Sequence, residues 1–453
     1  MLKMIRKIFL AVIVITLLLA PLSPFDLTWA YFVLGCGIFL TVLPALELRE
    51  KVVVLTITLL GMAIIWRFNL PAIVLIEGVG YFLKFTGILV IMQLFGIPIQ
   101  LGTYSADFEY LLFKSDKQEK HLFFLTTILT HFFASFLLFG SIPVIVSLLG
   151  KPLQNNVRNY ERFISMAMSR GYALMTSWSP SAIVLLVILG VTGLEWNQVF
   201  WWGACLSIIG IATSVFIEDK LHLSPEVLHL NQESALTPTN AWLSVRDIAL
   251  IVLGMITIIY LLEKTDLFSS VYCVMLAALI IFSIWMTKFL KSKRLTKVLK
   301  SFWEEDLLKT ANLSALFIAI GILAKAFESS GVIGYLLRYI NIAQWGYCSL
   351  VILPLIIIFT SMVGLHPLVS VVLLGKVFLA SQALISPVGI ALALVLGAAI
   401  SFMTCPIEAI ILVIAKFVGR RPQEVAWKWN GLYASLFFLE GVLFIFTLQA
   451  LIF

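Results

Sequence analysis

Long apolar runs follow one another along almost the whole of this 453-residue chain. A helix of about 20 apolar residues is long enough to cross the hydrocarbon core of a bilayer. Hydrophobic residues make up 61% of the chain and charged residues only 12%, against about 25% charged residues in a soluble domain. So few charged side chains exclude a soluble enzyme, a disordered scaffold and a fibrous protein. The sequence therefore predicts an all-α polytopic membrane protein.

The apolar runs divide into eleven expected transmembrane helices and two longer blocks. The blocks cover residues 121–150 and 347–384, and each has a glycine and a proline near its middle. Block 121–150 has basic residues at both ends, so by the positive-inside rule it returns to the side from which it entered. We expect both blocks to form re-entrant hairpins, of opposite orientation. The eleven spans are expected at roughly residues 7–22, 29–45, 52–66, 72–97, 163–190, 199–217, 247–263, 269–287, 311–328, 387–417 and 430–451.

Basic residues also set the orientation of the whole chain. Lys3, Arg6 and Lys7 precede the first span, and the most basic stretch, residues 288–300, falls between two later spans. Since such residues remain in the cytoplasm, we expect a multi-pass protein of the cell membrane with a cytoplasmic N-terminus and an external C-terminus. The net charge of +7 thus follows from topology and not from nucleic-acid binding, for which the basic patch with interleaved aromatic residues is missing.

The chain contains an internal repeat. Residues 171–203 align without gaps with residues 397–429, at an offset of 226 positions, and nine of the 33 pairs are identical, Pro180 and Pro406 among them. By the charge count the two segments cross the membrane in opposite directions, so the repeat is inverted. We expect three parts: an N-terminal helix plus first repeat (1–216, with hairpin 121–150 and broken helix 163–190), a cytoplasmic linker (217–246) and a second repeat (247–453, with hairpin 347–384 and broken helix 387–417).

Pro180 and Pro406 are expected to break their helices inside the membrane, because a proline in a helix removes a backbone hydrogen bond and frees a carbonyl. Freed carbonyls, nearby hydroxyls and half-helix N-termini are the groups with which transporters bind ions and solutes near the midplane. The alternative is a simple proline kink in which hydroxyls bond back to their own helix. With the hairpin tips, the breaks give the candidate solute- and ion-binding residues Ser141, Pro143, Ser177, Trp178, Ser179, Pro180, Ser181, Gly364, His366, Pro367, Thr404, Cys405, Pro406 and Glu408.

Three ionisable residues within the apolar segments are further candidates, because charge inside a membrane is expensive. His366 at the second hairpin tip and Glu408 beside the second break are candidates for carrying a proton, and Arg170 for binding an anion. Structural roles remain open for all three: a histidine bonded to a carbonyl, a glutamate paired with a lysine, and an arginine that reaches water. Two further pairs, Glu77 with Lys84 and Lys325 with Glu328, are expected to be ion pairs within the helix bundle.

The pattern resembles the ion transporter superfamily, including the divalent anion:sodium symporters and the arsenite- and citrate-type permeases. Residues 311–337 (ANLSALFIAIGILAKAFESSGVIGYLL) look like the ninth helix of that group, and residues 360–375 (TSMVGLHPLVSVVLLG) like its outer hairpin. The run Thr404-Cys-Pro-Ile-Glu-Ala-Ile410, and Ser179-Pro-Ser-Ala-Ile183 in the first half, are similar to the family's Thr-Pro-Pro-Asn-Ala-Ile run. The resemblance implies eleven helices with two hairpins, a scaffold with a moving transport domain, a homodimer and an elevator mechanism.

The chain departs from this family at the residues that bind sodium. Sodium-symporting members carry Ser-Asn-Thr at each hairpin tip, whereas here the tips read Gly140-Ser-Ile-Pro143 and Gly364-Leu-His-Pro367. The missing asparagines, together with His366 and Glu408, favour a proton over a sodium ion as the coupling ion.

The sequence predicts a secondary active transporter of a small, anionic solute, coupled to protons or sodium ions, with the lipid bilayer as its surroundings. The alternatives are a flippase for a lipid or a lipid-linked precursor on the same fold, and a polytopic membrane enzyme. An enzyme is disfavoured because none of the five histidines belongs to a recognisable catalytic motif. Five scattered cysteines indicate neither a disulfide framework nor a metal site, and we expect no cofactor and no metal.

Overall fold

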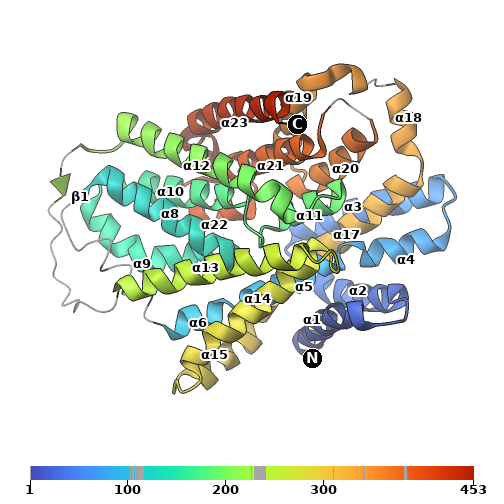
Figure 1. The fold of residues 1–453 in the computed structure, drawn as a ribbon, viewed down its shortest axis with the longest axis horizontal. Helices are drawn as coiled ribbons and strands as arrows, with labels where there is room; N and C mark the ends of the chain where they lie inside the picture. Colours follow the sequence, from blue (N-terminus) through green and yellow to red (C-terminus); the bar gives the residue numbers. More distant parts are fainter. Residues whose placement is uncertain are drawn as a thin grey trace. The chain divides into compact units, whose positions relative to one another are not determined.

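The structure of the chain, a computed structural model, is helical almost throughout (Figure 1). It describes residues 2–102, 104, 107, 110, 117–225, 227–228, 241–309, 311–339, 342–381 and 385–452. Among these residues eleven helices are long and apolar enough to cross a membrane. Two short strands, β1 (Lys117–Gln118) and β2 (Val227–Leu228), pair antiparallel, with Lys117 opposite Leu228. The prediction of an all-α polytopic membrane protein is confirmed.

The number of long apolar helices agrees with the sequence prediction, but two members of the set differ. The predicted span 52–66 is α3 (Leu48–Arg67), whose apolar part is shortened by charged residues at both ends. The predicted span 163–190 is divided by its break into two shorter helices. In their place stand the first arms of the two predicted hairpins, Glu119–Leu137 and Gln344–Val363, which are long enough to cross a membrane. That the two blocks enter the membrane and return to the same side stays a prediction.

The chain forms two compact units, each assembled from separate stretches of sequence. Unit 1 consists of Met1–Leu101, Met255–Gln344 and Val372–Ala383. Its helices are α1 (Leu2–Leu19), α2 (Thr28–Val42), α3, α4 (Ala72–Tyr81), α5 (Leu83–Gln93), α6 (Gly96–Leu101), α14 (Ser270–Met286), α15 (Leu295–Ser301), α16 (Leu307–Lys309), α17 (Ala311–Ser329) and α18 (Val332–Tyr339), with the later parts of α13 (Ala241–Glu263) and α20 (Pro367–Ala380).

Close packing of small residues holds the centre of unit 1 together. Helix α17 lies against α3 and α4. A Cβ atom on Gly321 of α17 would lie 2.4 Å from the carbonyl oxygen of Gly78 on α4, so glycine is required at this crossing. Inside a membrane, where burial of apolar surface no longer favours association, small residues allow helices to approach and gain dispersion energy.

Unit 2 consists of Gly102–Gly254, Trp345–Val371 and Leu384–Phe453. Its helices are α8 (Glu119–Leu137), α9 (Ser141–Asn156), α10 (Tyr160–Met175), α11 (Ile183–Thr192), α12 (Trp196–Leu221), α19 (Ser349–Val363), α21 (Pro387–Thr404), α22 (Ala409–Val418) and α23 (Gly431–Leu451), with the first parts of α13 and α20. Helix α21 is the central element, since it is buried along its length and packs against α10, α11, α19 and α23.

The predicted linker, residues 217–246, is helical at both ends, because α12 continues to Leu221 and α13 begins at Ala241. Most of the sequence between these helices lies outside the described residues. The two compact units do not coincide with the two predicted repeats, because unit 1 and unit 2 each take segments from both halves of the chain. The division into repeats is a prediction from sequence similarity, and the division into units describes packing.

Candidate functional site

The first predicted break is present between α10 and α11, where residues 176–182 leave the helix around Pro180. The hydroxyl of Ser177 lies 3.0 Å from the carbonyl oxygen of Gly203 and 2.6 Å from the hydroxyl of Ser207, both on α12. A Cβ atom on Gly203 would lie only 1.9 Å from the Ser177 carbonyl oxygen, so α12 approaches the break closely only because residue 203 is glycine. The broken segment is thus packed directly against a neighbouring helix.

The first hairpin lies against the same break. The carbonyl of Ser135 on α8 accepts hydrogen bonds from the hydroxyls of Ser181 and, at 3.5 Å, Ser179. Both serines are fully buried. Ser179 and Ser181 thus bond to the hairpin, whereas the hydroxyls of Thr176 and Ser177 bond back to their own helix, to the carbonyls of Ala173 at 2.6 Å and Leu174 at 2.7 Å, as in the proline-kink alternative. The break and the hairpin are therefore joined by direct hydrogen bonds.

A histidine that the sequence analysis did not select completes this contact. The indole N–H of Trp178 donates to Nε2 of His131 on α8 at 2.8 Å, and Nδ1 of His131 lies 3.1 Å from the carbonyl oxygen of Gly171. Because Nε2 accepts, Nδ1 must carry the proton and donate to Gly171, so the ring is neutral in this arrangement. The only signal for His131 in the sequence was a polar residue within an apolar run.

The second predicted break is present between α21 and α22, around Pro406. The thiol of Cys405 donates to the carbonyl of Ser361 on α19 at 3.1 Å. The hydroxyls of Thr404 and Ser401 instead bond back to their own helix, to Ile400 and Gly397 at 2.8 Å each. The second break therefore combines both alternatives: one contact to the hairpin and two bonds within the helix.

Equivalent contacts recur at the repeat offset of 226 positions. Ser135 corresponds to Ser361, and Ser179 to Cys405. In each repeat the residue before the proline therefore bonds to the equivalent carbonyl of its own hairpin. Helices α11 and α22 correspond over their full ten residues, and each ends at a left-handed glycine, Gly193 or Gly419. The two hairpin turns each contain a residue with positive φ: Leu138, with φ 49°, and Gly364, with φ 110°. The sequence similarity between the halves includes the hairpins, residues 140–150 and 364–375, and the contacts above agree with it.

The two broken helices run antiparallel. Helix α10 contacts α22 and helix α11 contacts α21, so the first half of each broken helix lies beside the second half of the other. Near the crossing, the ring of Tyr172 on α10 packs edge-on against Phe402 on α21, with ring centroids 6.2 Å apart. This pairing is consistent with two repeats of opposite direction, and their inverted orientation in the membrane stays a prediction.

Glu408 marks a difference in charge between the two repeats beside the breaks. It stands directly before α22, and its repeat mate Ala182 stands directly before α11. The side chain is buried, with 5% of its surface exposed, and interacts electrostatically with Tyr172. A carboxylate at a helix N-terminus is stabilised by the helix dipole, so α22 carries its own anion at this end, whereas α11 starts with uncharged residues.

The hairpin tips hold the remaining candidates. At the first tip, the Ser141 hydroxyl donates to the Leu138 carbonyl at 2.7 Å, and Pro143 lies in the first turn of α9. At the second tip, Nδ1 of His366 accepts the N–H of Leu368 at 3.2 Å, which caps the start of α20 at Pro367. A Cβ atom on Gly364 would lie 3.6 Å from Ile407, next to Pro406 in the second break. The second tip therefore lies near the second break. The first tip belongs to the hairpin that bonds to the first break.

Arg170 is fully buried in a polar network within unit 2. It donates to Glu218 on α12 at 2.8 Å, to Asn430 at 3.0 Å and to Ser214 at 3.1 Å. Its guanidinium lies 4.4 Å from the centroid of the Tyr433 ring. The Glu218 carboxylate also accepts a hydrogen bond from the guanidinium of Arg162 at 3.0 Å. These contacts give Arg170 a structural role, and its predicted role in anion binding stays a prediction.

Lysines and glutamates of unit 1 pair differently from the prediction. Glu77 bonds to Lys325 at 2.8 Å, and Glu328 bonds to Lys376 on α20, so neither Glu77 with Lys84 nor Lys325 with Glu328 is a salt bridge. Spacing along one helix could not reveal these partners, because both pairs join separate helices. Among the described residues, no group of three or more His, Cys, Asp or Glu side chains is arranged to hold a metal ion.

Comparisons with known proteins define the fold further. No protein-family model matches the chain, and neither does any curated protein. Two solved structures are similar over 81% of the chain. The YdaH transporter of Alcanivorax borkumensis, reported to have an unusual topology, has a TM-score of 0.58 at 14% identity, with 85% of that chain covered. MtrF of Neisseria gonorrhoeae, reported to illuminate a class of antimetabolite efflux pumps, has a TM-score of 0.53 at 18% identity, with 83% covered. At these identities the likeness shows a shared fold.

Proposed function

We propose that this protein is a secondary active transporter of a small anionic solute. The observation that carries the proposal is the pair of broken helices, antiparallel and each bonded to its own hairpin at positions 226 residues apart. Inverted repeats of this kind give one chain two related conformations, open to opposite sides of the membrane, around a site near the midplane. The fold shared with proteins described as a transporter and as an efflux pump supports the same class.

Unit 2 is the transport domain in this proposal, and unit 1 is the scaffold. Both breaks and the whole first hairpin belong to unit 2, so a solute bound at the breaks would move together with them. An elevator mechanism, in which unit 2 moves as a body, follows the resemblance to the ion transporter superfamily. We also propose a homodimer, as the resemblance implies. The basic residues support a cytoplasmic N-terminus in the cell membrane.

In this proposal the first break binds the solute and the second break binds the proton, because the two repeats differ in charge at the breaks. Helix α11 begins at Ile183 and is preceded by Ser181 and Ala182, so its N-terminus has no carboxylate directly before it and suits the anionic group of the solute. Helix α22 begins at Ala409, directly after Glu408. The anionic group of the solute and the Glu408 carboxylate would repel each other strongly in a region of low dielectric constant. Protonation of Glu408 removes this repulsion, so solute and proton bind together, which is symport.

Uptake into proteoliposomes tests the proposal. The full chain is reconstituted with an imposed proton or sodium gradient, and radiolabelled succinate, citrate, benzoate and phosphate serve as probes. We expect at least one probe to accumulate under an inward proton gradient. Glu408→Gln should abolish proton-driven accumulation, while Glu440→Gln should not, because Glu440 bonds to Thr213 on α12, away from the breaks. Accumulation of no anion under either gradient, or proton-driven uptake unchanged by Glu408→Gln, would contradict the proposal.

A further inference from the structure

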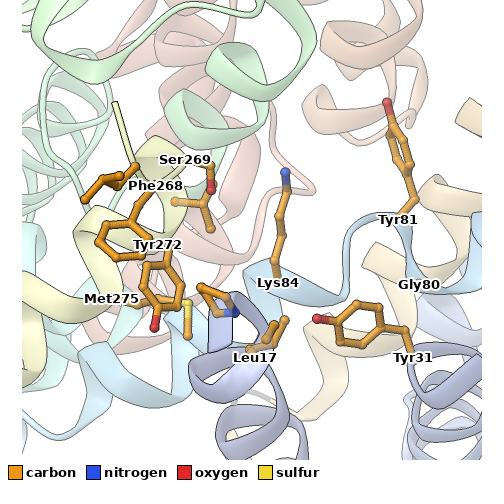
Figure 2. Close-up of a pocket in the computed structure, with 13 residues that line it drawn as sticks. Leu17, Tyr31, Gly80, Tyr81, Lys84, Phe268, Ser269, Tyr272 and Met275 are labelled. Atoms are coloured by element: carbon orange, nitrogen blue, oxygen red, sulfur yellow. The ribbon is translucent and has the colours of Figure 1, made fainter. Parts of the chain in front are cut away.

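A cavity of about 330 Å³ lies within unit 1, remote in sequence from the two breaks (Figure 2). Its walls come from the end of α1, from α2, from the junction of α4 and α5, and from the segment leading into α14. Pockets that hold small molecules or parts of larger ones measure about 300–1,000 Å³. The cavity is therefore large enough for a headgroup but too small for a whole lipid.

Lys84 is the only charged residue among those that line the cavity. It belongs to the apolar span Ala72–Leu101 and is half-buried. Its ammonium lies 5.6 Å from the centroid of the Phe85 ring and has no hydrogen bond or ion pair with any residue that the structure describes. Lys325 and Lys376 of the same unit, in contrast, are bonded to Glu77 and Glu328. A cation in a membrane span is costly and marks a functional site by default, so the cavity has the charge to receive an anion.

The other walls combine aromatic and apolar side chains. Figure 2 shows the hydroxyl of Tyr31 directed into the space between Leu17 and Lys84. Tyr272 donates its own hydroxyl to the Leu18 carbonyl at 2.7 Å and presents its ring to the cavity, next to Met275. A ligand here would meet one cation and hydroxyl groups at its polar end, and apolar surface along the rest. Such a site selects an amphipathic anion over a fully hydrated one.

The cavity also lies where two membrane spans end. Helix α1 and its short continuation stop at Leu22, α14 begins at Ser270, and the cavity is lined by Ala20, Pro21 and Ser269. Asp26 and Ser23 follow in an exposed turn. Tyrosine residues near the ends of spans are typical of the interface between lipid tails and headgroups, and a long lysine side chain within a span can extend its ammonium toward that interface.

We infer that this cavity binds the anionic headgroup of a membrane phospholipid, with the phosphate at Lys84 and the first acyl carbons against Leu17 and Met275. The site is separate from the proposed solute site, and its occupant comes from the bilayer and not from water. A soluble phosphate or carboxylate shares the charge but lacks the apolar part that the remaining walls require.

Native mass spectrometry of the purified full chain tests the inference. The protein in detergent is titrated with phosphatidylglycerol or with phosphatidylcholine, and the bound lipid is counted. We expect one site that retains phosphatidylglycerol preferentially, with the preference reduced about tenfold in Lys84→Gln and kept in Lys84→Arg. Lys264→Gln is the matched control: Lys264 also belongs to unit 1 and lies near the segment that leads into α14, but it is exposed and does not line the cavity.

A second measurement needs no variant. In nanodiscs, acetylation of Lys84 by an amine-reactive ester should be several times slower with phosphatidylglycerol than with phosphatidylcholine, relative to Lys264. Equal protection of both lysines, or a lipid preference that Lys84→Gln leaves unchanged, would overturn the inference. Displacement of the lipid by millimolar inorganic phosphate or benzoate would also overturn it, since the cavity would then be a site for a soluble anion.

Discussion

Replacing Arg170 by methionine separates a structural arginine from a solute-binding one. Methionine keeps much of the apolar volume but removes the positive charge that Glu218 faces at 2.8 Å. Both side chains are almost completely buried, with 0% and 1% exposed. Removing one partner of a buried pair costs about 3–5 kcal/mol, because the other charge remains uncompensated. Since Glu218 keeps Arg162 at 3.0 Å, we expect the lower end, about 3 kcal/mol.

The assay is thermal unfolding of the purified protein, followed by tryptophan fluorescence. A domain of about 150–250 residues loses about 2–4 °C in Tm for each kcal/mol, so Arg170→Met should lower the Tm of unit 2 by about 6–12 °C. The double variant Arg170→Met/Glu218→Gln should recover at least half of this loss, because no buried carboxylate is then left alone. Arg420→Met is the matched control: its contact with Glu161 is 3.9 Å long and exposed, and such pairs contribute about 0–1 kcal/mol.

Two results would refute this reasoning. One is an Arg170→Met variant as stable as Arg420→Met. The other is a double variant no more stable than the single one. If Arg170→Met kept its stability but lost anion uptake, Arg170 would be a solute-binding residue.

Three further predictions follow from the contacts in unit 2. Gly203→Ala should prevent stable folding, because its Cβ would lie 1.9 Å from the Ser177 carbonyl, whereas Gly431→Ala, with open space around it, should leave expression and Tm unchanged. Trp178→Phe should lower the free energy of unfolding by about 1–3 kcal/mol, because Nε2 of His131 loses its hydrogen-bond donor. Trp201→Phe, at an exposed position, should lower it much less. Equal Tm values for the two variants would contradict this prediction. Burial lowers the pKa of His222, outweighing the neighbouring Glu218 carboxylate, which raises it, while Arg162 and Arg170 lower it further. The folded protein thus favours neutral His222, so stability is retained above the ordinary histidine pKa of about 6.5 and decreases as the pH falls below it. His222→Gln should weaken this acid-induced fall in Tm. A pH dependence of Tm that the variant leaves unchanged would contradict the prediction.

Periodic and symmetric features were predictable from the sequence because they depend on composition and spacing. Apolar runs of sufficient length gave the class of fold. The matching prolines gave both breaks, since proline at mid-helix removes a hydrogen bond whatever the surroundings. The offset of 226 also pairs Gly193 with Gly419, and these two glycines end α11 and α22 in the structure.

Partners between helices were not predictable, because they depend on how distant segments pack. Lys325 bonds to Glu77 and not to Glu328 three residues away, since the two helices lie side by side in unit 1. His131 had no recognisable motif, and its importance appears only when Trp178 and Gly171 are placed around it. Asn430 bonds to Arg170 across 260 residues, which no local pattern indicates.

Accessibility of Cys405 from the two sides of the membrane tests the central claim most directly, and it requires no knowledge of the solute. Cys405 is buried at the second break, against the Ser361 carbonyl. In a variant with Cys36, Cys205, Cys273 and Cys348 replaced by serine, a membrane-impermeant maleimide is added to oriented vesicles from either side. Alternating access predicts labelling from both sides, with the balance shifted by a proton gradient and by Glu408→Gln. Labelling from neither side, or from one side under every gradient, would contradict the account.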